Sequence, residues 1–440
     1  MLAPVPQSTV RQAIQELKIK DFSKATIREV VAVAGKIEQA TGLEFIHMEM
    51  GVPGLPPAAV GVEAEIAALR KGVASIYPVI DGLPDLKREA SRFIKAFTDL
   101  DIAPEGCVPV VGSMQGTFTS FLVAGQCDAR RDTILFIDPG FPVQKQQAVI
   151  LGYRYESFDV YDFRGEQLRE KLESCLAKGN ISCIIYSNPN NPAWFCLNEQ
   201  ELQIIGELAT RYDVIVLEDL AYFAMDFRKD LGTPFRPPYQ VSVGKYTDNY
   251  LLLISGSKAF SYAGQRIGIV AMSDALYRRS YPGLTERYGG GTFGSVFIHR
   301  ALYAISSGAS HSAQYALAAM LKAASDGNFP FLEEVKEYGR RAGRLKAIFL
   351  QHGFEMVYDR DLDEAIADGF YFTVRYPGLS GGELMAALIP FGISAISLAT
   401  TGSNQEGLRV CTSFIKEHQY DLLERRLAVF VESLANESLF

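Results

Sequence analysis

The 440-residue sequence has no long hydrophobic run, no block of basic residues and few cysteine or histidine residues. Its longest apolar runs, such as 251–254, are far shorter than the roughly 20 residues that span a bilayer, and the N-terminal residues lack the apolar stretch of a secretion signal. Lys and Arg number 43 and Asp and Glu 51. Because a nucleic-acid-binding protein needs a basic surface, this balance argues against such a partner. We expect no membrane segment either.

The six cysteines are scattered without a CxxC spacing, and the five histidines show neither HxxxH nor Cys/His ligand spacing. Without a secretion signal, scattered cysteines indicate reduced thiols and a cytoplasmic location rather than a disulfide framework. The sequence therefore predicts neither a disulfide-rich domain nor a metal site.

Between residues 105 and 275, short β-rich runs alternate with amphipathic helical patterns. The predicted strands are 107–112, 133–138, 181–187, 214–219, 250–255 and 266–272. The predicted helices are 114–126, 142–151, 164–178 and 199–212, the last with a capping box from Asn198 to Glu201. Near-continuous apolar strands separated by helices predict an α/β fold with a mostly parallel sheet flanked by helices.

After about residue 295 the pattern changes to that of a smaller α+β domain. Its predicted helices are 295–307, 311–325, 331–352, 382–389 and 416–435, and its predicted strands are 355–358, 370–375, 393–398 and 407–411. We predict three parts: residues 1–60 packing on the small domain or on a partner subunit, a large ligand-binding domain at 61–305, and the small domain at 306–440.

The segment from Ser255 to Gly268 contains a lysine, Lys258, directly after the apolar run 250–255. Lysine is rarely buried without a partner, whereas a desolvated lysine at the end of a strand can form a Schiff base. Ser255, Ser257 and Arg266 supply donors that suit a phosphate group. A surface lysine on a Ser/Gly turn is the alternative for this motif taken alone.

Two further polar motifs follow predicted strands. Asp219 ends the run 214–219, with Tyr222 three residues later, and a buried carboxylate there would keep a pyridinium nitrogen protonated. Tyr222 and Asn191, in the rigid Asn-Pro-Asn-Asn-Pro loop after 181–187, could donate to a ring oxygen. Taken alone, these motifs are also consistent with an acidic helix cap and an ordinary Asn-Pro turn.

A glycine-containing turn, 112–116, joins a predicted strand to a predicted helix and contains Ser113 and Met114. Such a turn exposes backbone N–H groups at the positive end of a helix and can bind phosphate. Phe141, after another strand, could stack on a flat ring or belong to the core. All these residues follow strands of one sheet, where α/β proteins bind ligands, and together they indicate pyridoxal 5′-phosphate.

The order of these motifs, from Gly51 to Arg409, resembles that of the class I/II aminotransferases, the pyridoxal-phosphate enzymes of fold type I. The resemblance implies that Lys258 is the Schiff-base lysine and proton shuttle, with Asp219 as the partner of the pyridine nitrogen. It implies cofactor contacts for Tyr222, Asn191, Ser113, the Met114 N–H, Ser255, Ser257, Arg266 and the stacking ring Phe141.

The same resemblance implies that Tyr77 reaches the phosphate of the neighbouring subunit, which means a homodimer with shared active sites. Gly51, Asn191 and Arg409 are the implied contacts of the substrate carboxylate. The implied activity is a ping-pong transfer of an amino group from an L-amino acid to a 2-oxo acid, with no metal. A lyase or decarboxylase of the same fold, acting by C–S cleavage or β-elimination, is the main alternative. A transcription regulator is disfavoured because the sequence has no basic recognition helix, and a homologue without cofactor because every contacting residue type is present.

The sequence departs from the family pattern at three positions. Trp194, the only tryptophan, stands where the family usually has Gly after Asn-Pro-Thr, Gly256 replaces a bulkier residue, and Tyr262 an aliphatic one. We interpret Trp194 as a packing residue, with a role in the substrate path as the alternative. Arg287 lies roughly where dicarboxylate-specific members have an arginine, but we expect a neutral or aromatic amino acid and 2-oxoglutarate as substrates.

Overall fold

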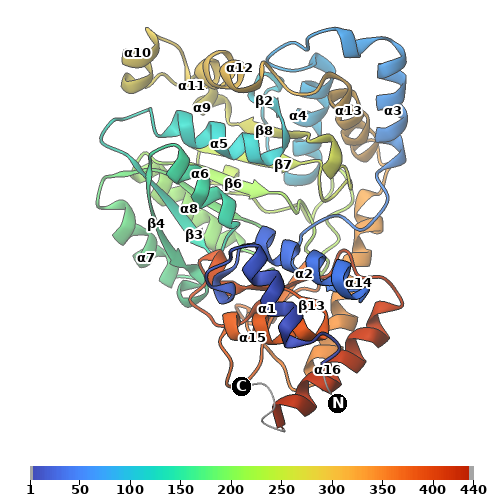
Figure 1. The fold of residues 1–440 in the computed structure, drawn as a ribbon. Helices are drawn as coiled ribbons and strands as arrows, with labels where there is room; N and C mark the ends of the chain where they lie inside the picture. Colours follow the sequence, from blue (N-terminus) through green and yellow to red (C-terminus); the bar gives the residue numbers. More distant parts are fainter. Residues whose placement is uncertain (1–2, 436–440) are drawn as a thin grey trace. The chain divides into compact units, whose positions relative to one another are not determined.

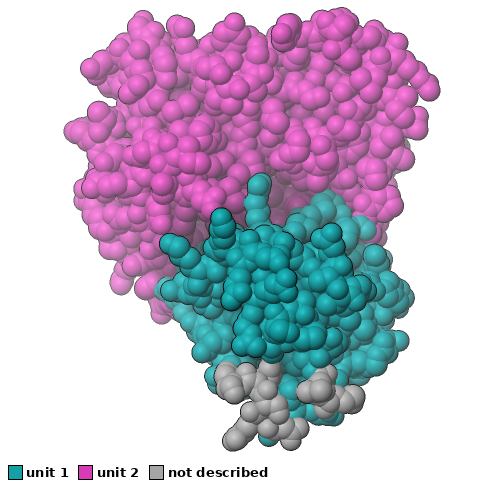
Figure 2. Space-filling model, viewed as in Figure 1, with its two compact units in different colours: residues 1–54, 190–195, 336–440 teal, residues 55–189, 196–335 magenta. Residues whose placement is uncertain are grey.

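The structure is a computed structural model of the chain, and it describes residues 3–435. The chain forms two compact units, which Figure 2 colours separately. Unit 1 comprises residues 1–54, 190–195 and 336–440, and unit 2 comprises residues 55–189 and 196–335. The predicted parts end at 60 and 305, whereas these units end at 54 and 335, and unit 1 also includes a six-residue segment from the middle of the sequence.

Unit 2 contains a seven-stranded sheet of order β2-β8-β7-β6-β5-β3-β4. The strands are β2 (Cys107–Val110), β3 (Thr133–Asp138), β4 (Arg154–Asp159), β5 (Ile181–Ser187), β6 (Ile215–Leu220), β7 (Tyr250–Ser255) and β8 (Gly268–Met272). Only β8 is antiparallel to its neighbours, so the predicted α/β fold with a mostly parallel sheet is confirmed. The sequence did not predict β4, because this edge strand is half exposed and rich in polar residues.

The helices of unit 2 include the four predicted between the strands. The helices of this unit are α3 (Ala59–Arg70), α4 (Pro84–Thr98), α5 (Gly112–Ala124), α6 (Pro142–Ile150), α7 (Gln167–Leu176), α8 (Glu199–Arg211), α9 (Asp274–Arg278), α10 (Pro282–Tyr288), α11 (Phe293–Val296), α12 (Tyr303–Ser306) and α13 (His311–Ser325). The four predicted ones are α5, α6, α7 and α8. The predicted capping box of α8 is confirmed, since the Asn198 and Glu201 side chains accept each other's backbone N–H at 2.9 and 3.0 Å. The single helix predicted at 295–307 is interrupted by a π-helical turn, Phe297–Leu302.

Helix α5 lies along the face of β7 and β8 (Figure 1). A Cβ atom on Gly116 would lie 2.9 Å from Val270 Cγ2 and 3.0 Å from Leu253 Cδ2. The missing side chain therefore lets the helix approach the sheet closely. This close approach sets the position of the N-terminus of α5 at the carboxyl end of the sheet.

Unit 1 is built around a four-stranded antiparallel sheet of order β14-β15-β12-β9. Its strands are β9 (Glu355–Met356), β12 (Tyr371–Arg375), β14 (Ile396–Ser397) and β15 (Leu408–Cys411), and β10 (Arg360–Asp361) pairs with β11 (Glu364–Ala365). Its helices are α1 (Gln7–Glu16), α2 (Ile27–Thr41), α15 (Gly381–Leu388), α16 (Gln419–Ala435) and most of α14 (Phe331–Gln351).

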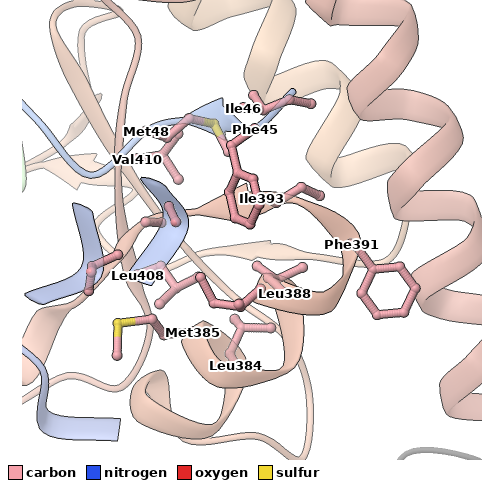
Figure 3. Packing of buried hydrophobic residues seen from close by; sticks show 14 of the residues in the cluster. Phe45, Ile46, Met48, Leu384, Met385, Leu388, Phe391, Ile393, Leu408 and Val410 are labelled. Carbon is pink, nitrogen blue, oxygen red and sulfur yellow. The ribbon is translucent and has the colours of Figure 1, made fainter. Parts of the chain in front are cut away.

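The N-terminal residues share one core with the C-terminal ones. Strand β1 (Ile46–His47) pairs in parallel with β13 (Ile393–Ser394), almost 350 residues later. Phe45 and Met48 pack with Leu384, Leu388 and other residues of the same cluster (Figure 3). The N-terminal segment is therefore an integral part of unit 1. Among residues 3–435, no helix combines the length and apolarity needed to cross a membrane.

We predict that Gly116→Leu lowers the melting temperature, because the added side chain would overpack the interface between α5 and the sheet at a cost of about 1–3 kcal/mol. The matched control is Gly35→Ala in the middle of α2, where an added Cβ atom would have no neighbour within 4 Å. This change should raise stability by about 0.5–1 kcal/mol through helix propensity alone. Thermal unfolding followed by circular dichroism measures both, and an unchanged midpoint for Gly116→Leu would contradict the close approach.

Candidate functional site

The strand register of unit 2 brings several predicted cofactor residues together. Gly268 of β8 pairs with Val110 of β2 on one side and with Ser255 of β7 on the other. A Cβ atom on Gly268 would lie 3.4 Å from the backbone nitrogen of Ser113. The turn after β2 and the turn after β7 are therefore neighbours across a strand that has no side chain at this point.

These neighbours form a cradle suited to an anion. Gly112 has a φ of +68°, and a Cβ atom there would lie 2.5 Å from Arg266 Nη2, so the guanidinium lies against the first turn of α5. Ser113 Oγ is buried and has no hydrogen-bond partner among residues 3–435. The backbone N–H of Ser257 donates to Ser255 Oγ at 3.1 Å. A helix N-terminus, an arginine and buried hydroxyl groups fit a phosphate, and Met114 lies in the same helical turn.

Asp219, near the end of β6, is a buried carboxylate. Gln144 Nε2 donates to its Oδ2 at 2.9 Å, and the Ala221 N–H donates to its Oδ1 at 3.1 Å. Burial raises the pKa of Asp219 to about 6, although both hydrogen bonds act in the opposite direction. Because burial disfavours the ionised form and a nearby cation favours it, this environment fits a protonated ring nitrogen.

The sequence analysis missed Gln144, which orients the Asp219 carboxylate. Phe141 is the N-cap of α6, and Gln144 follows one helical turn later, so the two residues lie on the same side of the helix. Phe141 is partly exposed, as a stacking ring must be before its ligand binds. The three-residue spacing after Phe141 was the available signal, but it gains meaning only with the contact to Asp219.

Lys258 and Tyr222 lie at the same edge of the sheet. β6 and β7 are adjacent and parallel, with Asp219 opposite Leu253, so the turns after both strands lie side by side. Tyr222 is buried in the turn after β6, and Lys258 is partly buried in the turn after β7. The structure therefore gathers eight of the predicted cofactor residues of unit 2 at one edge: Ser113, Met114, Asp219, Tyr222, Ser255, Ser257, Lys258 and Arg266.

The departure at Tyr262 has a structural explanation. Its hydroxyl group donates to Glu65 Oε2 at 2.6 Å, and Ser312 Oγ donates to Glu65 Oε1 at 2.9 Å. Glu65 lies on α3 and Ser312 on α13. The turn that contains Lys258 is thus tied to two helices through one buried carboxylate, a contact that an aliphatic residue could not make.

Arg409 of unit 1 is buried, with 1% of its surface exposed. Its Nη1 donates to Asn191 Oδ1 at 3.2 Å, and its Nη2 donates to the backbone oxygen of Glu49. Its Nε has no hydrogen-bond partner among the described residues. A buried guanidinium with an open donor fits a carboxylate ligand.

Two further residues hold Arg409 in place. Its guanidinium lies 4.6 Å from the ring centre of Tyr371, and a Cβ atom on Gly51 would overlap the Tyr371 hydroxyl oxygen. The Glu49 carboxylate accepts a hydrogen bond from Ser394 Oγ at 2.7 Å, which fixes the residue that contacts Arg409. The predicted substrate residues Gly51, Asn191 and Arg409 therefore lie together, whereas the sequence missed Tyr371 and Glu49.

Two predicted residues lie outside these clusters. Tyr77 is 88% exposed, next to the exposed apolar residues Ile76 and Val79. Arg287 is exposed on α10, whose Tyr288 donates to Gln126 at the C-terminal end of α5, at 2.6 Å. Because the anion cradle lies at the other end of that helix, the structure does not bring Arg287 to the cradle of its own chain.

Within residues 3–435, no group of three or more His, Cys, Asp or Glu residues is arranged to hold a metal ion. Five of the six cysteines are buried, and no disulfide forms within this range.

The chain is similar in sequence to known proteins. A probable aspartate aminotransferase of Methanocaldococcus jannaschii is 23% identical over 59% of this chain and 63% of its own length. The S-alkyl-thiohydroximate lyase SUR1 of Arabidopsis thaliana is 25% identical over 58% of this chain and 55% of its own length. The chain thus spans less than two thirds of the length of these curated relatives.

Among solved structures, alanine aminotransferase from Pyrococcus furiosus superposes with a TM-score of 0.74 at 18% identity. The superposition covers 95% of this chain and 99% of that one, which establishes the same fold. The family described as aminotransferase class I and II matches residues 45–426. The chain belongs to this aminotransferase class I and II family.

Proposed function

We propose that the protein is a pyridoxal-phosphate-dependent aminotransferase that moves an amino group from an L-amino acid to a 2-oxo acid. The observation that carries this proposal is the shared sheet edge of Asp219, Lys258 and the anion cradle at Gly112 and Arg266. A buried carboxylate, an amine and an anion cradle match the ring nitrogen, the aldehyde and the phosphate of this cofactor.

When bound, the cofactor supplies an electron sink for the charge that develops at the substrate α-carbon and carries the amino group between half-reactions. Asp219 holds the proton on the ring nitrogen, and Gln144 keeps that carboxylate in place. Tyr222 and Asn191 donate to the ring oxygen, and Phe141 stacks on the ring. The hydroxyl groups of Ser113, Ser255 and Ser257, the Met114 N–H and Arg266 hold the phosphate.

Lys258 binds the cofactor aldehyde and then moves the proton at the substrate α-carbon. Arg409 binds the α-carboxylate through its open donor, next to Gly51 and Asn191. Since the same groups serve both half-reactions, the keto acid product leaves before the second substrate binds, which is ping-pong kinetics. The pairing of a neutral or aromatic amino acid with 2-oxoglutarate stays a prediction from the sequence, as does the cytoplasmic location.

The exposure of Tyr77 supports a homodimer in which this residue completes the phosphate site of the neighbouring subunit. Its ring is 88% exposed in a single chain and is flanked by the apolar residues Ile76 and Val79. A second subunit covering this segment would bury those side chains.

A lyase that cleaves a C–S bond is the second candidate, and the relative named S-alkyl-thiohydroximate lyase favours it. The same lysine, carboxylate and phosphate groups serve both reactions, and the orientation of the substrate bonds relative to the ring decides the outcome. An S-alkyl-cysteine substrate separates the two reactions, because a lyase releases a thiol and ammonia together with a keto acid.

We predict that the purified protein binds pyridoxal phosphate with the visible absorbance of a lysine-bound cofactor, and that Lys258→Ala abolishes this absorbance. Replacement of an exposed lysine in Lys229→Ala is the matched control and should leave the spectrum unchanged. Addition of an amino-acid donor should bleach the absorbance and release one equivalent of keto acid. Release of thiol and ammonia from an S-alkyl-cysteine without lasting bleaching would favour the lyase, because the amino group then leaves as ammonia and does not stay on the cofactor. A spectrum unaffected by Lys258→Ala would contradict the proposal.

We predict that Asp219 makes the stability of the cofactor-free protein depend on pH. Burial raises the pKa of Asp219 to about 6 from an ordinary value of 3.8, so the folded state holds this proton more tightly than the unfolded state. The free energy of unfolding therefore falls as pH rises from about 4 to about 6, by at most about 3 kcal/mol.

Asp219→Asn removes this titration. Its melting temperature should exceed that of the wild type at pH 8, and the difference should shrink toward pH 4. Saturating pyridoxal phosphate should narrow the difference at pH 8, because a protonated ring nitrogen compensates the buried charge of the wild type only. Parallel pH profiles of the two cofactor-free proteins would contradict the assignment.

A further inference from the structure

Trp194 occupies an unusual backbone conformation in the 190–195 segment of unit 1. Its φ is +68°, a left-handed value that is unfavourable for a non-glycine residue. Its side chain is fully buried. A glycine at this position would avoid the backbone cost, so the indole must make compensating contacts.

Gly369 provides the space for this indole. A Cβ atom on Gly369 would lie 2.0 Å from Cε2 and 2.1 Å from Nε1 of Trp194. The φ of Gly369 is not in the left-handed region, so its backbone conformation would accept other residues, and the nearest obstacle to a side chain is the indole. Trp194 and Gly369 therefore form a complementary pair in which one residue fills the space that the other leaves.

A chain of aromatic contacts leads from this pair to Arg409. The ring centres of Trp194 and Tyr371 lie 6.2 Å apart, with an edge-on angle of 66°. The other end of the chain is the Arg409 guanidinium, 4.6 Å from the Tyr371 ring centre. Gly51 lies against the Tyr371 hydroxyl group. The Tyr371 side chain thus contacts the indole of Trp194, the backbone of Gly51 and the guanidinium of Arg409.

We propose that Trp194 is a positioning residue for Arg409. The indole fixes the plane of Tyr371, and Tyr371 fixes the guanidinium in the orientation in which its open Nε faces the substrate carboxylate. This inference rests on the proposed role of Arg409 as the carboxylate anchor. Because every substrate contributes an α-carboxylate, Trp194 affects the affinity for donor and acceptor alike and does not select among side chains.

The kinetic test uses the holoenzyme with Trp194→Gly, which also relieves the left-handed backbone, and with Trp194→Phe, which keeps an aromatic edge. Trp194→Gly should raise KM for the amino acid and for the 2-oxo acid by similar factors, about 3- to 30-fold, since aromatic and cation–π contacts are of that size. Its kcat should change by less than about threefold. The KM values of Trp194→Phe should lie between those of the wild type and those of Trp194→Gly.

Gly369→Ala should raise KM in the same way, because its methyl group displaces the indole. In the Trp194→Gly background the same methyl group meets no indole, so Gly369→Ala should have no further effect there. Such non-additivity is the signature of a direct coupling. Additive effects of the two changes would contradict the complementary pair.

A spectroscopic test exploits the fact that Trp194 is the only tryptophan. Titration of the holoenzyme with 3-phenylpropionate or succinate, carboxylates that lack an amino group, should change the tryptophan emission in a saturable way. The change should persist in Lys258→Ala, which cannot carry out the reaction, and should disappear in Arg409→Gln.

An active Trp194→Gly or Trp194→Phe enzyme with wild-type KM values, or an emission that neither carboxylate alters, would overturn the inference and leave the proposed function standing. A wild-type protein that responds to carboxylates but transfers no amino group would overturn the proposed function while supporting the link between Trp194 and Arg409.

Discussion

Two buried charged groups, Asp219 and Arg409, lie at the centre of the two candidate site clusters, and their hydrogen-bond partners are all neutral. Asp219 accepts hydrogen bonds from an amide side chain and a backbone N–H, and Arg409 donates to an amide oxygen and a carbonyl oxygen. Neither has an oppositely charged partner among residues 3–435. Because burying an unpaired charge is costly, each site strongly favours a ligand of opposite charge. In the proposed function these ligands are a cationic ring nitrogen at Asp219 in unit 2 and a carboxylate at Arg409 in unit 1.

Local sequence patterns predicted most strands and helices of unit 2, because each of these elements has a recognisable pattern of apolar and polar residues. Buried parallel strands read as apolar runs, and the turns after them contain the polar residues, so Asp219 and Lys258 could be identified by position. The sequence did not reveal Gln144, because its contact with Asp219 depends on how α6 packs on the sheet. The contact of Tyr371 with Arg409 depends on the strand register. Tyr371 pairs with Cys411, two residues beyond Arg409, and so lies diagonally across from the guanidinium on the same face of the sheet.

Unit 1 combines segments that lie far apart in the sequence. Residues 45–48 and 190–195 lie far from the C-terminal sequence but belong to its unit. Linear patterns of hydrophobicity describe neighbours along the chain, and they contain no information on the pairing of β1 with β13. Trp194 illustrates the same limit. Its contacts with Gly369 and Tyr371 span more than 170 residues, so the sequence could not show which residues it packs against.

The fit between Trp194 and Gly369 also constrains which substitutions the chain can accept. A tryptophan at position 194 can be accommodated only where residue 369 has no side chain, whereas a glycine at 369 is compatible with a small residue at 194. A larger residue at 369 therefore requires a smaller residue at 194, whereas a smaller residue at 194 makes no demand on 369. The freedom of position 369 is thus set by the side chain at 194 and not by its own backbone conformation.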